Sequence, residues 1–177
     1  MAWSVPPTAA ANMVFTASQW NQGVRDNLAE TAPAKATSSG GIFVTAGANS
    51  IAQREIASDY INAAETETST TYTDLATAGP AVTVTTGPKA LIWLSTQINN
   101  SSTNTSVMSC AVSGDTTQVA SDGRAVLRDG GSGLDRRMGI TNLFETLNSG
   151  SNTFTAKYRV SAATGTWQRR RLVVMAL

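Results

Sequence analysis

Histidine is absent from this chain of 177 residues, and charged residues are scarce. Without histidine, the chain lacks the commonest general base and the commonest metal ligand of proteins. Charged residues make up only 14% of the chain, against about a quarter in an average domain. The formal net charge is +1, which gives no electrostatic basis for wholesale binding to nucleic acid or to a membrane surface. We therefore expect neither as a partner.

Cysteine occurs once, so no disulfide can form within the chain. Cys110 lies in the apolar run 107–112, which predicts a buried, inert thiol rather than a nucleophile. The sequence has no apolar run long enough to span a membrane, and its first residues lack the charge and hydrophobicity of a signal peptide. These absences predict synthesis and folding in a cytoplasm.

Recognisable motifs for catalysis or metal binding are missing as well. The turns at Asp115, Asp122 and Asp129 lack the alternating oxygen ligands and final glutamate of a calcium loop. The glycine-rich segment 129–133 lacks the Lys-Ser/Thr ending of a phosphate-binding loop. We therefore expect no enzymatic activity, no catalytic residues, no cofactor and no metal site.

One short helix is well signalled near the N-terminus. Thr16 can serve as its N-cap, and Gln19 is spaced to complete a capping box. Phe15 before the cap and Trp20 in the first turn are placed for a hydrophobic staple. These signals predict a helix that begins at Ala17.

The apolar residues of this helix form one stripe. Trp20, Val24 and Leu28 recur every four residues and therefore line one side of a helix from residue 17 to about 29. Pro33 is expected to end it. Such a stripe must pack against something, either the core of this protein or a partner.

The remainder of the chain is rich in strand signals. In 154–160 apolar residues alternate with polar ones, which predicts a half-buried strand. The run 90–94 is apolar throughout and predicts a central strand covered on both faces. With turn signals between about eight such segments, the pattern predicts a mainly β protein, an antiparallel β-sandwich that is jelly-roll-like.

Composition divides the chain into three parts. We expect an extended arm and helix in 1–37, a linker with short strands in 38–57, and the β-sandwich in 58–177. Adjacent prolines at positions 6 and 7 exclude regular structure from the arm.

Arginines form the one concentration of charge. In a regular strand two of the three consecutive arginines would share a face with Trp167, and the middle one would point to the other face. Pairing with acidic side chains of a neighbouring strand or subunit is a better interpretation than phosphate binding, because the chain is nearly neutral. The candidate interface charges are Arg136, Arg137, Arg169, Arg170 and Arg171.

Several stretches carry a resemblance to a known group of proteins. They are Trp3 with FTASQWNQGVRDNL at 15–28, ETETSTTYTDL at 65–75, GPAVTV at 79–84, KAL at 89–91, SNTFTAKYR at 151–159 and RLVV at 171–174. Together these stretches resemble small virion proteins of tailed bacteriophages, especially those that infect actinobacteria.

The resemblance implies a structural protein on the outer surface of a phage particle, either a capsid decoration or head-fibre protein or a minor tail protein. It implies self-association, often as a homotrimer, and attachment to the major capsid protein or to other virion proteins through the N-terminal segment. The expected anchoring residues are Trp3, Val5, Phe15, Trp20, Val24 and Leu28.

Two locations on the particle remain open. The chain has no coiled-coil or repeat shaft, which favours a short capsid decoration over a receptor-reaching tail fibre. The alternative is a minor tail protein, or a tail-located module that recognises a receptor or glycan through the loops 99–104 or 130–134. Both loops lack the aromatic residues that usually form a sugar platform.

Overall fold

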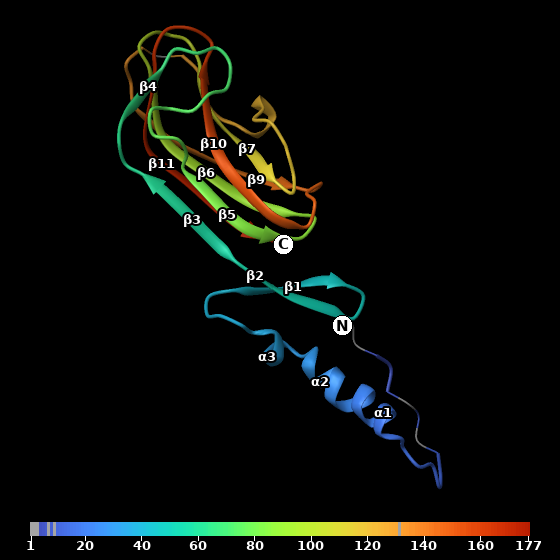
Figure 1. The fold of residues 1–177 in the computed structure, drawn as a ribbon. Coiled ribbons are helices and arrows are strands. Elements are labelled where there is room, and N and C mark those ends of the chain that lie inside the picture. The colour runs from blue at the N-terminus through green and yellow to red at the C-terminus, as the bar shows by residue number, and fades with distance from the viewer. Residues whose placement is uncertain (1–3, 7, 9, 131) are drawn as a thin grey trace. The chain divides into compact units, whose positions relative to one another are not determined.

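The chain divides into two compact units, Met1–Glu55 and Ile56–Leu177 (Figure 1). The structure is a computed structural model, which describes residues 4–6, 8, 10–130 and 132–177. Each unit is described below by itself.

Unit 1 contains the predicted helix. Its helical stretch runs through α1 (Ala17–Trp20), a π-helical segment η1 (Asn21–Asp26) and α2 (Asn27–Ala29). The capping box is present, because Thr16 accepts a hydrogen bond from the Gln19 backbone and the Gln19 side chain accepts one from the Thr16 backbone. The cap satisfies amides that have no partner within the helix.

Two details of this stretch differ from the prediction. Its centre is π-helical rather than α-helical, with Gly23, a poor helix former, inside that segment. The helical stretch ends at Ala29 as predicted, but Pro33 then lies in the first turn of a further helix, α3 (Ala32–Lys35), which was not predicted. A proline is tolerated there because first-turn residues need no backbone N–H donor.

The second half of unit 1 is a β-hairpin. Strands β1 (Ile42–Gly47) and β2 (Ser50–Arg54) pair antiparallel, and Asn49 in the turn between them has a φ of +55°. Asparagine tolerates this left-handed conformation better than most residues. Short strands, as predicted within 38–57, are therefore present on both sides of this turn.

Unit 2 is built from two antiparallel sheets. The four-stranded sheet has the order β5 (Ala81–Thr86), β10 (Gly150–Val160), β7 (Ser106–Gly114) and β8 (Val126–Arg128). The other has the order β3 (Ile56–Ile61), β11 (Gly165–Ala176), β6 (Ala90–Asn100) and β9 (Arg136–Phe144), with the short β4 (Glu65–Glu67) beside the start of β11. A 3₁₀ turn, η2 (Asp122–Arg124), precedes β8.

The pairing of these strands is that of a jelly roll. Apart from β4, the first strand pairs with the last (β3 with β11), the second with the seventh (β5 with β10), the third with the sixth (β6 with β9) and the fourth with the fifth (β7 with β8). This is a long antiparallel ribbon rolled into two facing sheets. The predicted mainly β, sandwich-like fold is confirmed, and most of its visible strands in Figure 1 lie in this unit.

The core lies between the facing sheets. In β10 the alternating residues Phe154, Ala156, Tyr158 and Val160 are fully buried, as their pattern predicts. Edge-to-face aromatic contacts join Phe144 to Phe154 and Tyr158 to Trp167, with ring centroids 5.5 and 5.3 Å apart. Such pairs add to the free energy of area burial.

The prediction that β6 is covered on both faces is wrong. Ile92 and Leu94 are buried in the core, whereas Leu91 is only partly buried and Trp93 is 37% exposed. The strand is central in its sheet, but its sheet has one covered face.

A β-bulge in β11 changes the side of the sheet to which the three consecutive arginines were predicted to point. The register between β11 and β6 shifts between Gln168 and Arg171, and Arg169 has a φ of +52°. The extra residue reverses the alternation, so that Trp167 and Arg170 both point into the core and Arg171 points out. Regular alternation had predicted Trp167 and Arg170 on opposite faces.

Arg170 is fully buried but well compensated. Its Nη2 lies 3.0 Å from a carboxylate oxygen of Glu65, and its Nη1 donates to the carbonyl oxygens of Thr77 and Gly79. Its guanidinium also lies 5.6 Å from the ring centroid of Tyr158. The predicted pairing with an acidic residue of a neighbouring strand is confirmed for Arg170.

Loss of the Glu65 charge should destabilise unit 2. A Glu65→Gln variant leaves the buried Arg170 cation without its counter-charge, which should lower the free energy of unfolding by about 3 kcal/mol. The exposed pair of Lys89 and Glu145, 3.7 Å apart, supplies the control. A Glu145→Gln variant should change the free energy by less than about 1 kcal/mol in the same urea titration.

This destabilisation should depend on pH in one direction. Burial acts to raise the pKa of Glu65, but hydrogen bonds from Thr77 and the charge of Arg170 outweigh it and hold the pKa below the ordinary value of 4.5. The stabilisation is therefore complete above pH 4.5 and lost as the pH falls through the lowered pKa. Urea titrations should show the difference between wild type and Glu65→Gln shrinking in acid; a constant difference would contradict the assignment.

Candidate functional site: two interaction surfaces

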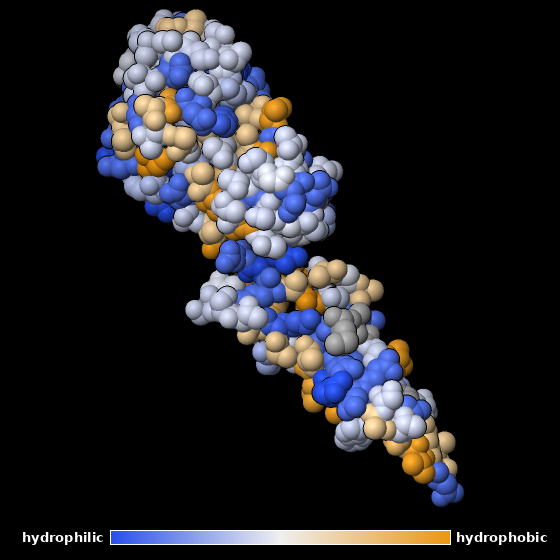
Figure 2. Space-filling model, viewed as in Figure 1, coloured by the Kyte–Doolittle hydropathy of each residue, from blue (hydrophilic) through white to orange (hydrophobic). Residues whose placement is uncertain are grey.

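Unit 1 has no buried apolar side chain among the residues that the structure describes. The predicted anchoring residues are exposed instead: Val5 is 90%, Trp20 61% and Leu28 59% exposed. In Figure 2, hydrophobic orange atoms lie among hydrophilic blue ones along this part of the chain. Trp3, also predicted as an anchor, lies outside the described residues.

Three of the predicted anchors meet around one small cavity. Phe15, Trp20 and Val24 line a hollow of about 140 Å³, together with Pro6, Gln19 and Gly23. Leu28 and Val5 do not line it. The aromatic rings of the predicted staple therefore form part of an open apolar surface on the helix.

Asn27 fastens the arm to this helix, a role that sequence analysis missed. Its side chain is buried, accepts a hydrogen bond from the Ser4 backbone at 2.9 Å and donates to the Ser4 carbonyl at 3.0 Å. It also donates to the carbonyl of Gly23. The only sequence signal was an asparagine inside a helix, where this residue type is unfavourable.

An ion pair lies at the end of the helical stretch. Lys35 Nζ lies 2.9 Å from a carboxylate oxygen of Glu30. The hydrogen bond from Lys35 holds the pKa of Glu30 below its usual value. This contact joins α3 to the residue that follows α2.

The outer face of the five-stranded sheet is the second candidate surface. Strand register places an apolar row across four strands, because Ile56 pairs with Met175, Met175 with Leu91, and Leu91 with Leu143. Trp93 and Val173 occupy the next row. We call this set the outer apolar face, comprising Ile56, Tyr60, Leu91, Trp93, Leu143, Val173 and Met175.

Side chains of the outer apolar face are only partly buried. Ile56 is 48%, Leu143 44% and Trp93 37% exposed. Adjacent exposed apolar side chains on one sheet face are characteristic of a surface that binds another molecule. This surface was not predicted, because the apolar run 90–94 indicated a strand covered on both faces.

The five candidate interface arginines occupy different places. Arg171 lies on the outer face, with its guanidinium 4.9 Å from the ring centroid of Tyr60, and Arg169 is exposed at the bulge. Arg137 points to the outer face, whereas Arg136 is on the inner side of β9. Arg170 is excluded from a subunit interface, since it is fully buried within its own unit.

Tyr72, Asp122 and Arg159, whose pKa values are all shifted, form a contact between separate segments of unit 2. Asp122 accepts hydrogen bonds from the Tyr72 hydroxyl at 2.7 Å and from Arg159 at 2.5 and 3.0 Å. Arg159, followed by Tyr72, lowers the pKa of Asp122, while burial and then Asp122 raise the pKa of Tyr72 to about 12. The contact attaches the loop containing Tyr72 to η2 and β10.

The lone cysteine and the acidic side chains that the structure describes show no arrangement that suggests a reactive or metal-binding site. Cys110 is buried in the core, and burial raises the pKa of its thiol to about 12. The described part of the chain contains no group of three or more acidic or cysteine side chains placed to hold a metal ion. It also contains no helix long and apolar enough to cross a membrane.

Comparison with known proteins finds similar solved structures at low sequence identity. No protein family and no curated protein matches this sequence. A VP2 chain from the infectious bursal disease virus subviral particle is 13% identical with a TM-score of 0.49, and the match covers 77% of this chain and 38% of that chain. Eiger TNF from S. frugiperda is 10% identical with a TM-score of 0.44, covering 69% of this chain and 92% of that one.

A carbohydrate binding module from Cellvibrio mixtus lichenase 5A, solved in complex with cellotriose, is 11% identical with a TM-score of 0.34. That match covers 67% of this chain and 97% of the module. The matched region thus spans well under half of the viral VP2 chain but nearly all of the two smaller proteins. The function assigned below rests on the two surfaces and on the sequence resemblance.

Proposed function

We propose that this protein is a non-enzymatic structural component of a bacteriophage virion, a capsid decoration or head-fibre protein on the outer surface of the particle. Unit 1 attaches to the major capsid protein or a neighbouring virion protein. Unit 2 is the projecting β-sandwich, and it associates with further copies of itself.

The observation that carries this proposal is the exposure of the apolar residues of unit 1. A folded segment that buries none of its described apolar side chains gains little from folding alone, since burial of apolar area is the main stabilising contribution. Burying the exposed parts of Phe15 and Trp20 in a partner would contribute on the order of 5 kcal/mol, before the cost of ordering the arm. The arm and helix therefore suit attachment.

Attachment would stabilise the particle by mass action. A protein that binds only the assembled shell shifts the equilibrium toward assembly. The outer apolar face supports self-association of unit 2, and a homotrimer around a symmetry axis is the arrangement that we propose for it.

One observation supports the alternative of a tail-located receptor or glycan-binding module. The two loops considered for recognition lie together, because Gly133 donates its backbone N–H to the carbonyl of Asn100 at 2.8 Å and the Ser132 hydroxyl donates to the carbonyl of Ser101 at 3.0 Å. A joined pair of loops at one end of a sandwich is a common place for recognition.

Removal of residues 1–30 should separate folding from attachment. Unit 2 has its own core, so the truncated chain should unfold cooperatively with nearly unchanged stability, yet it should no longer co-sediment with virions. In the full chain, a Phe15→Ser/Trp20→Ser variant should likewise lose binding, while Val119→Ser, at an exposed site in unit 2, should keep it. Undiminished co-sedimentation of the truncated chain would refute attachment through unit 1.

Substitution on the outer apolar face should disrupt self-association. Trp93→Glu introduces a charge at the centre of this face, and desolvating that charge should cost several kcal/mol per interface. Sedimentation velocity should show the wild type as an oligomer and Trp93→Glu as a monomer, while Val119→Glu behaves like wild type. A wild-type protein that stays monomeric at all concentrations would argue against this interface.

A further inference from the structure

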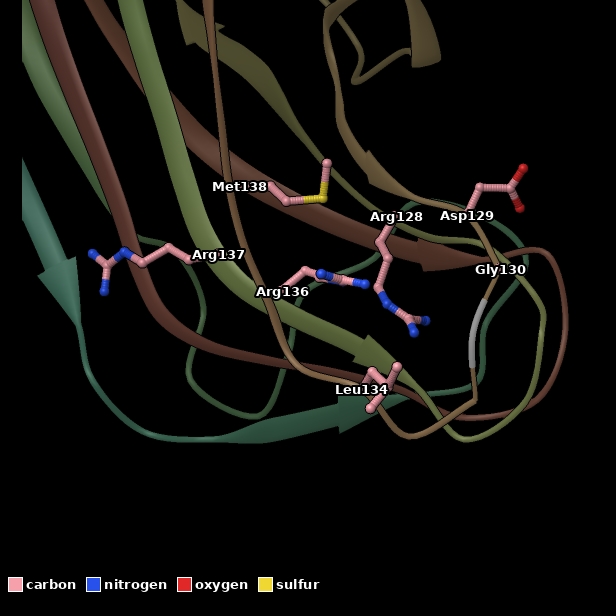
Figure 3. A pocket seen from close by; sticks show the side chains of 7 residues that line it. All are labelled: Arg128, Asp129, Gly130, Leu134, Arg136, Arg137 and Met138. Atoms are coloured by element: carbon pink, nitrogen blue, oxygen red, sulfur yellow. The ribbon is translucent and has the colours of Figure 1, made fainter.

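The space between the two sheets of unit 2 opens at one edge into a cavity of about 520 Å³ (Figure 3). The edge strands β8 and β9, which belong to opposite sheets, contribute residues to its lining, as does the segment between them. This volume lies within the range of roughly 300 to 1,000 Å³ that is typical of small-molecule sites.

Two arginines reach into the cavity from opposite sheets. Arg128 of β8 stands opposite Ser106, and Arg136 of β9 stands opposite Ile98, both of which are fully buried. Cross-strand partners share a face, so both arginines point inward. Figure 3 shows their side chains converging, while Arg137, the next residue of β9, points away.

Arg128 is buried, and two of its three guanidinium nitrogens have no hydrogen-bond partner among the described residues. The residue is only 3% exposed, and its buried Nε and Nη1 atoms have no partner in the described part of the chain. Arginine is protonated at every physiological pH, so a full positive charge is placed there. Arg170, in the same sandwich, also has Nε and Nη2 atoms without a described hydrogen-bond partner, but its charge is compensated by the Glu65 carboxylate, two carbonyls and an aromatic ring.

The acidic residues nearby in sequence are engaged elsewhere. The Thr105 hydroxyl donates to Asp129 at 2.9 Å, and Figure 3 shows the Asp129 carboxylate directed away from Arg128. Asp135 accepts hydrogen bonds from Gln97 and Asn99. No ion pair recorded between described residues includes Arg128 or Arg136. Asp129 also lines the cavity, but with its carboxylate directed away, neither arginine has an ion-pair partner there among the described residues.

We propose that this cavity binds an oxyanion, a phosphate or carboxylate group, on a small organic ligand. Guanidinium groups bind such oxyanions through paired, charge-assisted hydrogen bonds, and an anion between Arg128 and Arg136 would compensate both charges. Leu134 and Met138 also line the cavity and are 56% and 37% exposed. They supply apolar contact for the organic part of the ligand. This site adds a ligand-binding activity to the proposed structural role and does not depend on it.

The test is a calorimetric titration of the full-length protein with defined probes. Glucose 6-phosphate and glucuronate present the two oxyanions on an organic body, glucose is the uncharged control, and inorganic phosphate tests the anion alone. We expect at least one of the two organic anions to bind, more tightly than inorganic phosphate, and glucose not to bind. The affinity should fall as salt is added, because charge attraction contributes to it.

Two arginine variants separate binding from folding. Arg128→Met should weaken binding of the organic anion roughly 10- to 100-fold, since charge-assisted hydrogen bonds are lost. The same variant should raise the urea midpoint of the ligand-free protein, because it removes a buried, unpaired charge. Arg169→Met, at an exposed arginine that does not line the cavity, should bind nearly as the wild type does.

Three results would overturn the proposal. The first is that neither organic anion binds the wild-type protein. The second is equal binding by wild type and Arg128→Met, or a lower urea midpoint for Arg128→Met, which would make this arginine a structural residue. The third is that no probe binds the wild type and that sedimentation shows the Arg128→Met variant to have lost self-association. An acidic side chain of a second copy would then be the group that occupies the cavity.

Discussion

Burial of two sheet faces against each other is the constraint on which the rest of this structure depends. The long strands β6, β10 and β11 present inward side chains to one shared core, with β6 and β11 in one sheet and β10 in the facing sheet. Once the inner faces are fixed by this burial, the outward residues of the regular strand segments are fixed too, because neighbouring side chains point to opposite faces there. The outer apolar face thus follows directly from the formation of the core.

Unit 1 shows the consequence of burying no apolar side chain among its described residues. Its helix is capped by Thr16 and Gln19 and fastened to the arm by Asn27, so its local structure is made by hydrogen bonds. Hydrogen bonds contribute only about 1 kcal/mol each after the loss of bonds to water. The exposed Phe15 and Trp20 could add much more through contact with another surface.

Two buried arginines in one sandwich illustrate how differently a charge can be accommodated. Arg170 enters the core through the bulge in β11 and meets Glu65, two carbonyl oxygens and the ring of Tyr158. Arg128 enters from an edge strand beside an open cavity and forms no ion pair with an acidic side chain of the described structure. The first arrangement suits a structural residue, and the second suits a residue that gains its counter-charge from a ligand.

Local patterns in the sequence were enough to predict the capped helix at Thr16, the strand alternation of 154–160 and the β-sandwich class. Each of these depends on neighbours a few residues apart, where spacing alone decides which side chains share a side. Three features could not be predicted in this way: the inward direction of Arg170, the hydrogen bonds between Asn27 and the arm, and the exposure of Trp93. A bulge, a contact between residues 4 and 27, and an uncovered sheet face all arise from pairing of distant segments, and only the tertiary structure decided them.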